Sequence, residues 1–491
     1  MPSSTNSHIQ IKLGKQSYPA TWLSGTEAVS TPFLFHFEFL APFTFNVRDY
    51  PGKQVTLEFN APDGFKRRVS GLIWLIEETD TRDEKTRLMG IHCHVVPRLS
   101  LLKENFDQRI FLGHTAVDIT KMILEQHGYK PYQLKFNLGG TPPIHAYTLQ
   151  VEQNDFDFVH RVLAKDGIFY YFDCETQQDI TMETIRFFDA TTYCPYLKRG
   201  MVRYFPPSGM GQGIKNPAEP NKEYTSLYKL QDHHSLVTGE WGHHDTNDQT
   251  PEVELYQTHR SGTDSNLKNP GKHIKFGDGA LSLEEIDRQA RFAAERAKVK
   301  AHHLTASGNI ADVAAGRLVS LDASKFQNTL TGDYFITAVS HTLGKPQCSI
   351  TEFASEEPDP VDSHIKEHTL GRISTLREFP EPTFTSTDPD AGPDYRCDFS
   401  LIKRDTPFRP ELPEKPEIPL TFTARIESDG KYASLDNQGR YHLRKLLDLG
   451  DRQHTQAINP PLRKLQPYAG PMVAPGIPAS RDTCASCTSH S

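Results

Sequence analysis

The sequence has few of the features that define several common protein classes. Its 491 residues include seven Cys and three Trp, and the scattered thiols indicate reduced, mostly buried cysteines. No uninterrupted apolar run approaches the ~18–20 residues that span a membrane. The first residues show neither the basic region nor the apolar core of a signal peptide. We therefore expect synthesis in the cytosol, without stable membrane insertion.

Basic excess and catalytic motifs are also lacking. The 54 basic and 62 acidic residues give a net charge of −8, which argues against a nucleic-acid binder with its basic stripe. Gly209, Gly211 and Gly213 are followed by Ile-Lys-Asn-Pro, without the helix or the Lys-Ser/Thr of a phosphate loop. No Gly-x-Ser-x-Gly elbow occurs, and spacing singles out no glycosidase-like carboxylate pair. We expect no catalytic residue, no cofactor and no enzymatic activity.

Two short patterns could begin a metal site, and neither reaches a full ligand set. His92 and His94 would share one face of a strand, but no carboxylate or third histidine lies nearby in sequence. Cys484 and Cys487 form a Cys-x-x-Cys pair, with only His490 close enough to suggest a third ligand. We expect structural histidines and two thiols in a flexible tail.

Paired histidines form a third pattern. His233-His234 and His243-His244 are flanked by three acidic residues, Asp232, Glu240 and Asp245. Adjacent residues point to opposite faces of a strand, and no His-Glu-x-x-His helix is present. A fortuitous divalent-ion site is conceivable here, but the pattern favours a polar surface hairpin. We expect no metal ligands among these residues.

Residues 147–172 predict a compact strand–helix–strand unit. Polar and apolar residues alternate before Asn154, which can cap a helix. Phe158 and Val162 belong to one apolar helix face, and Gly167 supplies a left-handed stop before an apolar strand. The residues expected to carry this unit are Phe156, Phe158, Val162 and Gly167.

Strand and helix patterns flank this unit. Alternating Phe33, Phe35, Phe37 and Phe39 predict a strand with one face on a core. Thr115 and Asp118 form a capping-box pattern for a helix over 115–126, and a second box opens a helix over 282–300.

The run from 152 to 172 closely resembles the hub signature of VgrG proteins, the spike proteins of type VI secretion systems, which are related to contractile-tail hubs. Further segments that resemble this family lie at 70–73, 87–102, 107–111, 116–120, 332–341, 407–410, 424–428, 436–441 and 465–470. The resemblance implies an α+β, mainly β fold: two hub β-barrels with an inserted α+β domain, then a partial OB-type barrel.

The expected parts of the chain are a first hub β-barrel (1–100), an α+β hub domain (101–220), a second hub β-barrel with a long helix at 282–300 (221–380), a Pro-rich linker (381–419), a partial OB-like domain (420–470) and a disordered tail (471–491). After Gly470 the sequence departs from the family pattern, because it resembles neither the rest of the OB barrel nor the β-helical spike. We expect a chain truncated in its OB and spike region.

The resemblance implies a structural role. Such a hub forms a homotrimer on the hexameric Hcp tube and joins the tube to the spike for contractile delivery of effectors. A PAAR tip protein, baseplate proteins and effectors are further possible partners, and export would follow the type VI apparatus from the bacterial cytoplasm. Two alternatives stay open: a phage-hub-like cell-wall hydrolase, and a spike-less binding module that caps assembly.

Overall fold

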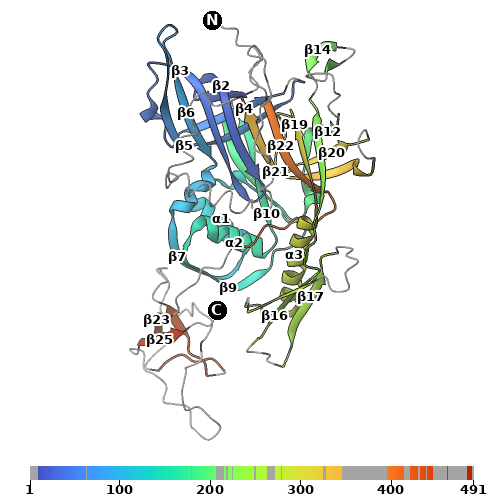
Figure 1. The fold of residues 1–491 in the computed structure, drawn as a ribbon. Helices are drawn as coiled ribbons and strands as arrows, with labels where there is room; N and C mark the ends of the chain where they lie inside the picture. The colour runs from blue at the N-terminus through green and yellow to red at the C-terminus, as the bar shows by residue number, and fades with distance from the viewer. Residues whose placement is uncertain are drawn as a thin grey trace.

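The computed structural model describes residues 9–61, 63–177, 180–205, 215–216, 219–223, 225–247, 250, 252–262, 271–277, 279–324, 328–344, 395–413, 421–428, 432–437, 439–445, 462 and 484–488. Among these residues the chain is mostly strand, with a few helices (Figure 1). The predicted fold class, α+β and mainly β, is confirmed.

The first six strands hydrogen-bond into a closed ring. They are β1 (Ile9–Leu13), β2 (Gln16–Ala28), β3 (Thr31–Pro42), β4 (Gln54–Asn60), β5 (Lys66–Asp83) and β6 (Leu88–Val96). The order is β1-β4-β5-β6-β3-β2, and β2 pairs back onto β1. Phe33, Phe35, Phe37 and Phe39 are all buried in the core, because every second side chain of a strand points to the same face.

A second set of strands closes in the same way. It comprises β12 (Tyr196–Arg203), β15 (Leu227–His234), β19 (His302–Gly308), β20 (Leu318–Asp322), β21 (Gly332–Leu343) and β22 (Tyr395–Lys403). The pairings run β20-β21-β22-β19-β15, and β12 lies parallel to β20. The bridge between Tyr204 and Leu227 links the end of β12 to β15 and completes the ring.

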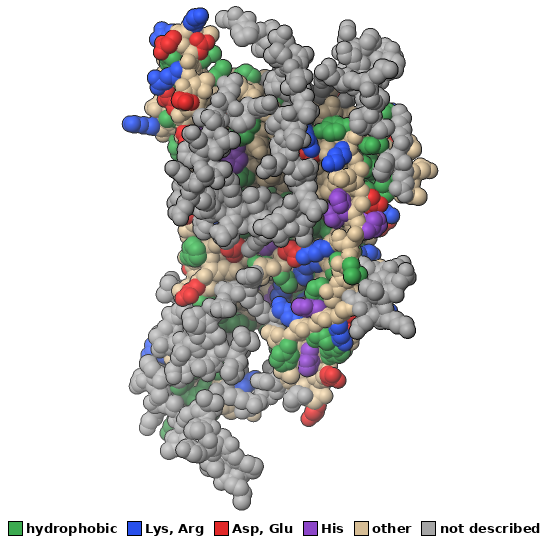
Figure 2. Space-filling model, viewed as in Figure 1, with side chains coloured by type: hydrophobic (Ala, Val, Ile, Leu, Met, Phe, Trp, Pro, Cys, Tyr) green, Lys and Arg blue, Asp and Glu red, His purple; other side chains and the backbone are tan. Residues whose placement is uncertain are grey.

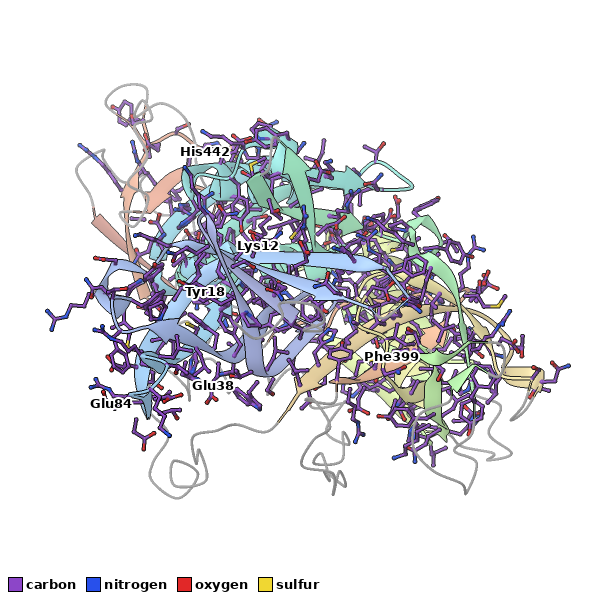
Figure 3. All side chains as sticks on the ribbon, turned by 90° about the horizontal axis from the view of Figure 1, so that it is seen from above. Lys12, Tyr18, Glu38, Glu84, Phe399 and His442 are labelled. Atoms are coloured by element: carbon purple, nitrogen blue, oxygen red, sulfur yellow. The ribbon has the colours of Figure 1, made fainter. Side chains whose placement is uncertain are left out.

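One strand pairing fuses the two rings. β2 and β21 are antiparallel, in a register that runs from Leu23–Leu343 to Ala28–Ala338. The buried side chains of both rings belong to one continuous apolar cluster. Seen from above, the rings lie side by side, with Lys12 and Glu38 on the first and Phe399 on the second (Figure 3).

Two predicted boundaries are wrong. β22 lies in the segment expected to be a Pro-rich linker, although Tyr395, Cys397 and Phe399 alternate as buried residues along it. β12 lies inside the expected α+β domain but pairs with the second ring. In both cases long-range strand pairing sets the structure, against the composition of the surrounding sequence.

The α+β part packs below the rings (Figure 1). Its elements are β7 (Phe106–Thr115), α1 (Ala116–Gln126), β8 (Leu134–Asn137), β9 (Ile144–Asn154), α2 (Asp155–Lys165), β10 (Phe169–Gln177) and β11 (Ile180–Phe188). Both helix starts are confirmed: Thr115 and Asp118 form a reciprocal capping box, and the Asn154 side chain accepts from the Asp157 amide. The helices and strands share a second apolar cluster.

The long helix α3 (Leu283–Ala301) carries a small sheet of its own. That sheet is made of β16 (Glu240–Asp245), β17 (Leu255–Arg260) and β18 (Lys272–Phe276), in the order β17-β16-β18. Ser282 caps the helix by accepting from the Glu285 amide, as the capping-box pattern predicts. The sheet projects away from the rings at the lower end of the molecule (Figure 1).

Short elements complete the described structure. They are β13 (Lys215–Asn216), β14 (Glu219–Glu223), β23 (Thr421–Ile426), β24 (Leu443–Lys445), β25 (Cys484–Thr488) and the 3-10 turns Val47–Asp49, Arg98–Glu104, Pro131–Gln133, Thr191–Tyr193 and Asn328–Leu330. Much of the predicted OB-like region lies outside the described residues. The predicted disorder of 471–491 is wrong for 484–488, which pair with β23 because that strand has an edge that β24 does not cover.

Candidate functional site

The predicted strand–helix–strand unit forms an interior junction. Phe156, Phe158 and Val162 are buried in the α+β core. Gly167 has a φ of +72°, and a Cβ there would lie 2.7 Å from the ring of Phe292 on α3. The unit therefore holds α2 closely against α3.

A buried carboxylate, Asp155, fixes the start of α2. The sequence patterns did not identify this residue. Asp155 accepts from the side-chain Nδ2 of Asn105 at 2.6 Å, from Gln150 Nε2 at 2.7 Å and from Arg109 Nη1 at 2.8 Å. Burial acts to raise the pKa of Asp155, but these donors and His127 outweigh it and lower the pKa. The helix is thereby tied to the preceding strands.

Residues 404–413, here called the exit strap, cross α2 and α3 after β22. Arg409 donates to the carbonyl oxygens of Gly167 at 3.1 Å and Asp189 at 2.5 Å, and its Nε lies 2.6 Å from Glu295 Oε2. Its guanidinium carbon lies 4.3 Å from the ring centre of Phe292. These contacts hold the chain against α2 and α3 where it leaves the second ring.

Two further contacts reinforce the exit strap. Arg296 Nε on α3 donates to the Pro410 carbonyl at 2.7 Å, and burial lowers the pKa of Arg296 to about 10. The ring of Phe408 packs against Phe169 and Phe335, with centroids 5.4 and 6.0 Å away. The segment 407–410 is therefore a packed junction rather than part of an extended linker.

A polar clamp joins the two rings at their seam. Glu27 of β2 forms a two-pronged ion pair with Arg67 of β5, both contacts at 2.5 Å, and accepts from His341 Nε2 of β21 at 2.7 Å. His341 Nδ1 also lies 2.6 Å from the hydroxyl of Tyr395 on β22. Burial would raise the pKa of Glu27, but Arg67 and His341 lower it to about 2.

One buried carboxyl shows the opposite behaviour. Glu183 on β11 accepts from the Tyr129 hydroxyl at 2.5 Å and from the Arg98 amide at 2.8 Å. Burial dominates and raises its pKa to about 7, because the cation of Arg98 compensates it only weakly. A perturbed carboxyl can mark a catalytic acid, but Glu183 is almost fully covered and lies in the packed interior.

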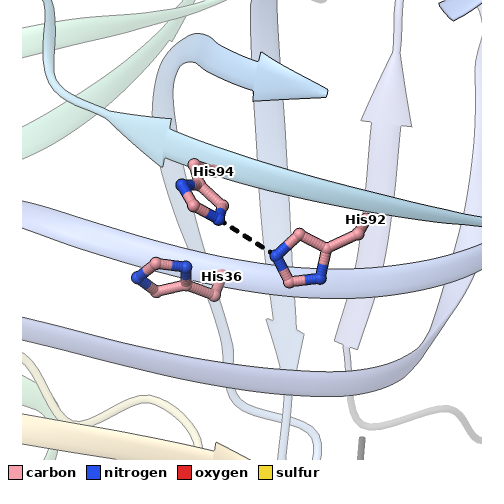
Figure 4. A group of neighbouring side chains, drawn as sticks. All are labelled: His36, His92 and His94. Carbon is pink, nitrogen blue, oxygen red and sulfur yellow. Dashed lines mark hydrogen bonds between the residues drawn. The ribbon is translucent and has the colours of Figure 1, made fainter. Parts of the chain in front are cut away.

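The structure adds His36 to the predicted histidine pair. His92 and His94 lie on β6, and His36 lies opposite His94 on the neighbouring strand β3. The Nε2 atoms of His92 and His94 are 3.0 Å apart, and the three rings converge (Figure 4). Sequence spacing could not reveal this partner, because the pairing of β3 with β6 is non-local.

The predicted hairpin of the paired histidines is wrong, because His233 and His234 lie on β15, which pairs with β19, whereas His243 and His244 lie on β16, which pairs with β17 and β18. Asp232 lies 3.2 Å from His234 Nε2 and 2.8 Å from His302 Nε2, while His233 contacts Thr305 instead. In Figure 2 the histidines in view lie mainly on the side of the second ring and of the small sheet β17-β16-β18. Among the described residues, two groups bring three ligand-type side chains together: His36, His92 and His94, and Asp232, His234 and His302.

Among the residues that the structure describes, the remaining sequence candidates bring no further site together. Asp245 accepts from the Ala280 amide at 2.7 Å and anchors the start of α3, beside the half-buried His244. Cys484 and Cys487 lie on β25, while His490 and the glycines at 209, 211 and 213 fall outside the described residues. None of the described helices is long and apolar enough to cross a membrane.

Most of the sequence that forms the two fused rings and the inserted α+β part matches the model of a known protein family. The family described as phage tail baseplate hub (GPD) matches residues 26–347. The chain belongs to this hub family. The predicted resemblance to VgrG-type hub proteins is confirmed.

Several relatives of this hub are VgrG spike proteins. Type VI secretion system spike protein VgrG4b of Pseudomonas aeruginosa is 30% identical over 151 residues, which cover 30% of this chain and 18% of the relative. VgrG5 of the same species is 28% identical over 207 residues, covering 42% and 25%. The matched regions thus span a quarter or less of the length of these relatives.

Solved hub structures share the fold. The Escherichia coli c3393 protein, a type VI secretion component described as similar to the phage T4 tail proteins gp27 and gp5, matches with a TM-score of 0.54 and 18% identity over 88% of each chain. A chain of the lidless PdpA–VgrG complex matches with a TM-score of 0.53 and 10% identity, over 98% of this chain and 85% of that one.

Proposed function

We propose that this hub protein is a structural component of a type VI secretion system, in which a homotrimer joins the Hcp tube to the spike. Its role is assembly rather than chemistry, and contractile delivery of effectors depends on the joint it makes. The observation that carries the proposal is the fusion of two six-stranded rings in one chain through β2 and β21. Three copies would present six rings to a hexameric tube.

The rigidity of the fusion supports this role. The rings share a continuous apolar core, and Glu27 links β2 to β5 and β21 by buried hydrogen bonds. A platform that transmits force between a tube and a spike needs its rings to keep a fixed relative orientation. A buried, hydrogen-bonded charge pair specifies such an orientation, because any sliding leaves a charge unpaired.

The proposal includes the route and partners of the protein. It would be made in the bacterial cytoplasm and leave through the type VI apparatus, as part of the spike complex. A PAAR tip protein, baseplate proteins and effectors would bind the assembled spike. The comparisons support this through the names of the relatives, since both Pseudomonas aeruginosa proteins are spike proteins of that system.

Light scattering after size exclusion tests the proposal. The chain is measured alone and with the Hcp protein of the same system, and an unrelated hexameric ring protein serves as the control. We expect a mass of about three 55.5 kDa chains, and a further increase with Hcp but not with the control ring. A strict monomer whose mass Hcp leaves unchanged would contradict the assembly role.

A further inference from the structure

Three imidazoles from two neighbouring strands meet on the outer face of the first ring. Along β3 the side chains of Phe35 and Phe37 enter the core, so His36 between them points outward. His92 and His94 lie two residues apart on β6 and share that outward face. His92 and His94 are nevertheless buried, at 7% and 9% exposure, so the cluster is sheltered from bulk water.

The spacing of the ring nitrogens suits a transition-metal ion. One nitrogen from each of the three histidines lies within 4.8 Å of the other two, and the Nε2 atoms of His92 and His94 are 3.0 Å apart. Tetrahedral Zn²⁺ with Zn–N distances of about 2.05 Å places its nitrogen ligands roughly 3.3 Å apart. No nitrogen–nitrogen distance in the cluster therefore has to shorten by more than about 1.5 Å to reach that spacing.

A carboxylate is placed to orient one of these ligands. Glu38 lies opposite His92 in the β3–β6 register, and its Oε1 is 3.6 Å from His92 Nδ1. Metal-bound histidines usually donate their second ring nitrogen to such a carboxylate, which fixes the tautomer that leaves Nε2 for the ion. Trp22 stacks on the His92 ring at 5.9 Å and limits its rotation from the other side.

We propose that His36, His92 and His94 bind a divalent transition-metal ion of the zinc class, with Glu38 as the residue that orients His92. Three neutral imidazoles suit Zn²⁺, Ni²⁺ or Cu²⁺ rather than Mg²⁺ or Ca²⁺, which prefer oxygen ligands. The ion would replace the hydrogen bond between the two Nε2 atoms and join β3 to β6 across the ring surface. The fourth position stays open to water or another ligand. This site is independent of the proposed function.

The second close group provides a built-in comparison. Asp232, His234 and His302 also lie within bonding range of one ion, but the His234 side chain is 68% exposed. Among the described residues, both of its histidines contact Asp232, which is itself one of the three ligands, so neither has a separate orienting carboxylate such as Glu38. Because exposed ligands must be ordered by the ion, we expect this group to bind more weakly than the cluster on the first ring.

Binding of Zn²⁺ to the full-length chain tests the proposal by isothermal titration, and native mass spectrometry counts the ions. The variants are H36Q, H92Q and H94Q, with E38Q for the orienting carboxylate and H234Q as the matched control. The visible absorption spectrum of bound Co²⁺, used in place of Zn²⁺, reports whether the coordination is tetrahedral. Circular dichroism without metal verifies that each variant is folded. His36 is the least buried of the three histidines, so we expect H36Q to disturb the fold least.

We expect one tightly bound ion per chain and a loss of affinity of at least about 100-fold in each of the three ligand variants. E38Q should weaken Zn²⁺ binding by about 10–100-fold, as expected for a residue that orients a metal ligand. H234Q should change the affinity of the tight site less than twofold. Unchanged affinity in folded H36Q would overturn the proposal. Loss of the tight site in H234Q alone would overturn it as well, by placing the ion at the other group.

Discussion

Replacing Glu27 by Gln removes the charge at the seam between the two rings while keeping the shape of the side chain. In the wild type, Glu27 binds Arg67 with both oxygens and accepts from His341. Arg67 is only 14% exposed and His341 is fully buried. In the variant, the guanidinium stays in the interior with neutral partners only, the Gln side chain and the Val313 carbonyl.

Two routes give the magnitude of the effect. Breaking one side of a buried ion pair typically costs about 3–5 kcal/mol, because the remaining charge is left uncompensated. The fall of the Glu27 pKa from 4.5 to about 2 corresponds to about 3 kcal/mol of stability at pH 7. We expect the free energy of unfolding of E27Q to be about 3 kcal/mol lower than that of the wild type.

The pH dependence has a definite sign. A carboxyl whose pKa is lowered by folding stabilises the protein above pH 4.5, and this contribution is lost as the pH falls toward 2. The difference in the free energy of unfolding between the wild type and E27Q should therefore decrease as the pH falls below about 4.5. Burial also lowers the pKa of His341, so that residue weakens the fold below pH 6.5 in both proteins.

Urea unfolding followed by tryptophan fluorescence measures these effects, because Trp22 lies on β2, the strand that also carries Glu27. Glu58 is the matched control: it also lies on a strand of the first ring, but its partners Lys12 and Arg68 are 40% and 38% exposed. E58Q should cost less than about 1 kcal/mol. Equal losses of unfolding free energy in E27Q and E58Q would refute the role of the polar clamp. A difference between wild type and E27Q that stays constant in acid would also refute it.

Other predictions concern the interior and the exit strap. Because burial raises the pKa of Glu183 to about 7, the wild type should lose stability as the pH rises from 4.5 through 7, and thermal unfolding of E183Q between pH 5 and 8 should lack that loss. G167A should cost at least about 1 kcal/mol more in urea unfolding than G14A, since both positions have positive φ but only a Cβ at Gly167 meets Phe292; equal losses would contradict this packing. R409M should expose the exit strap to limited proteolysis, with R404M, at a 39% exposed arginine, as the control, and identical cleavage of both would exclude the clamping role of Arg409.

Local signals predicted the centre of the molecule well. The capping residue Asn154, the apolar face with Phe158 and Val162 and the stop at Gly167 all depend on neighbours within a few positions. Such signals are contained in a short window of sequence, so their geometry can be derived before the fold is known. The capping box of Thr115 and Asp118 belongs to the same class.

Long-range pairing was the part that the sequence could not reveal. In β22 every second residue from Tyr395 to Phe399 is buried, as expected for a strand. The strand nevertheless lies within an acidic, proline-rich region whose composition indicates a linker. The approach of His36 to His92 likewise depends on the β3–β6 register. Neither strand neighbours nor ring closure can be read from a window of sequence, because they depend on segments that are distant in the chain.

The late position of β22 affects how the protein folds during synthesis. The first ring can close once β6 has left the ribosome, but β22 pairs between β21 and β19, so the second ring stays open until residues 395–403 emerge. Until then β19 and β21 each keep an unpaired edge, and such edges are prone to aggregation in nascent chains. The interval between the synthesis of β21 and that of β22 is therefore when this chain most needs a chaperone.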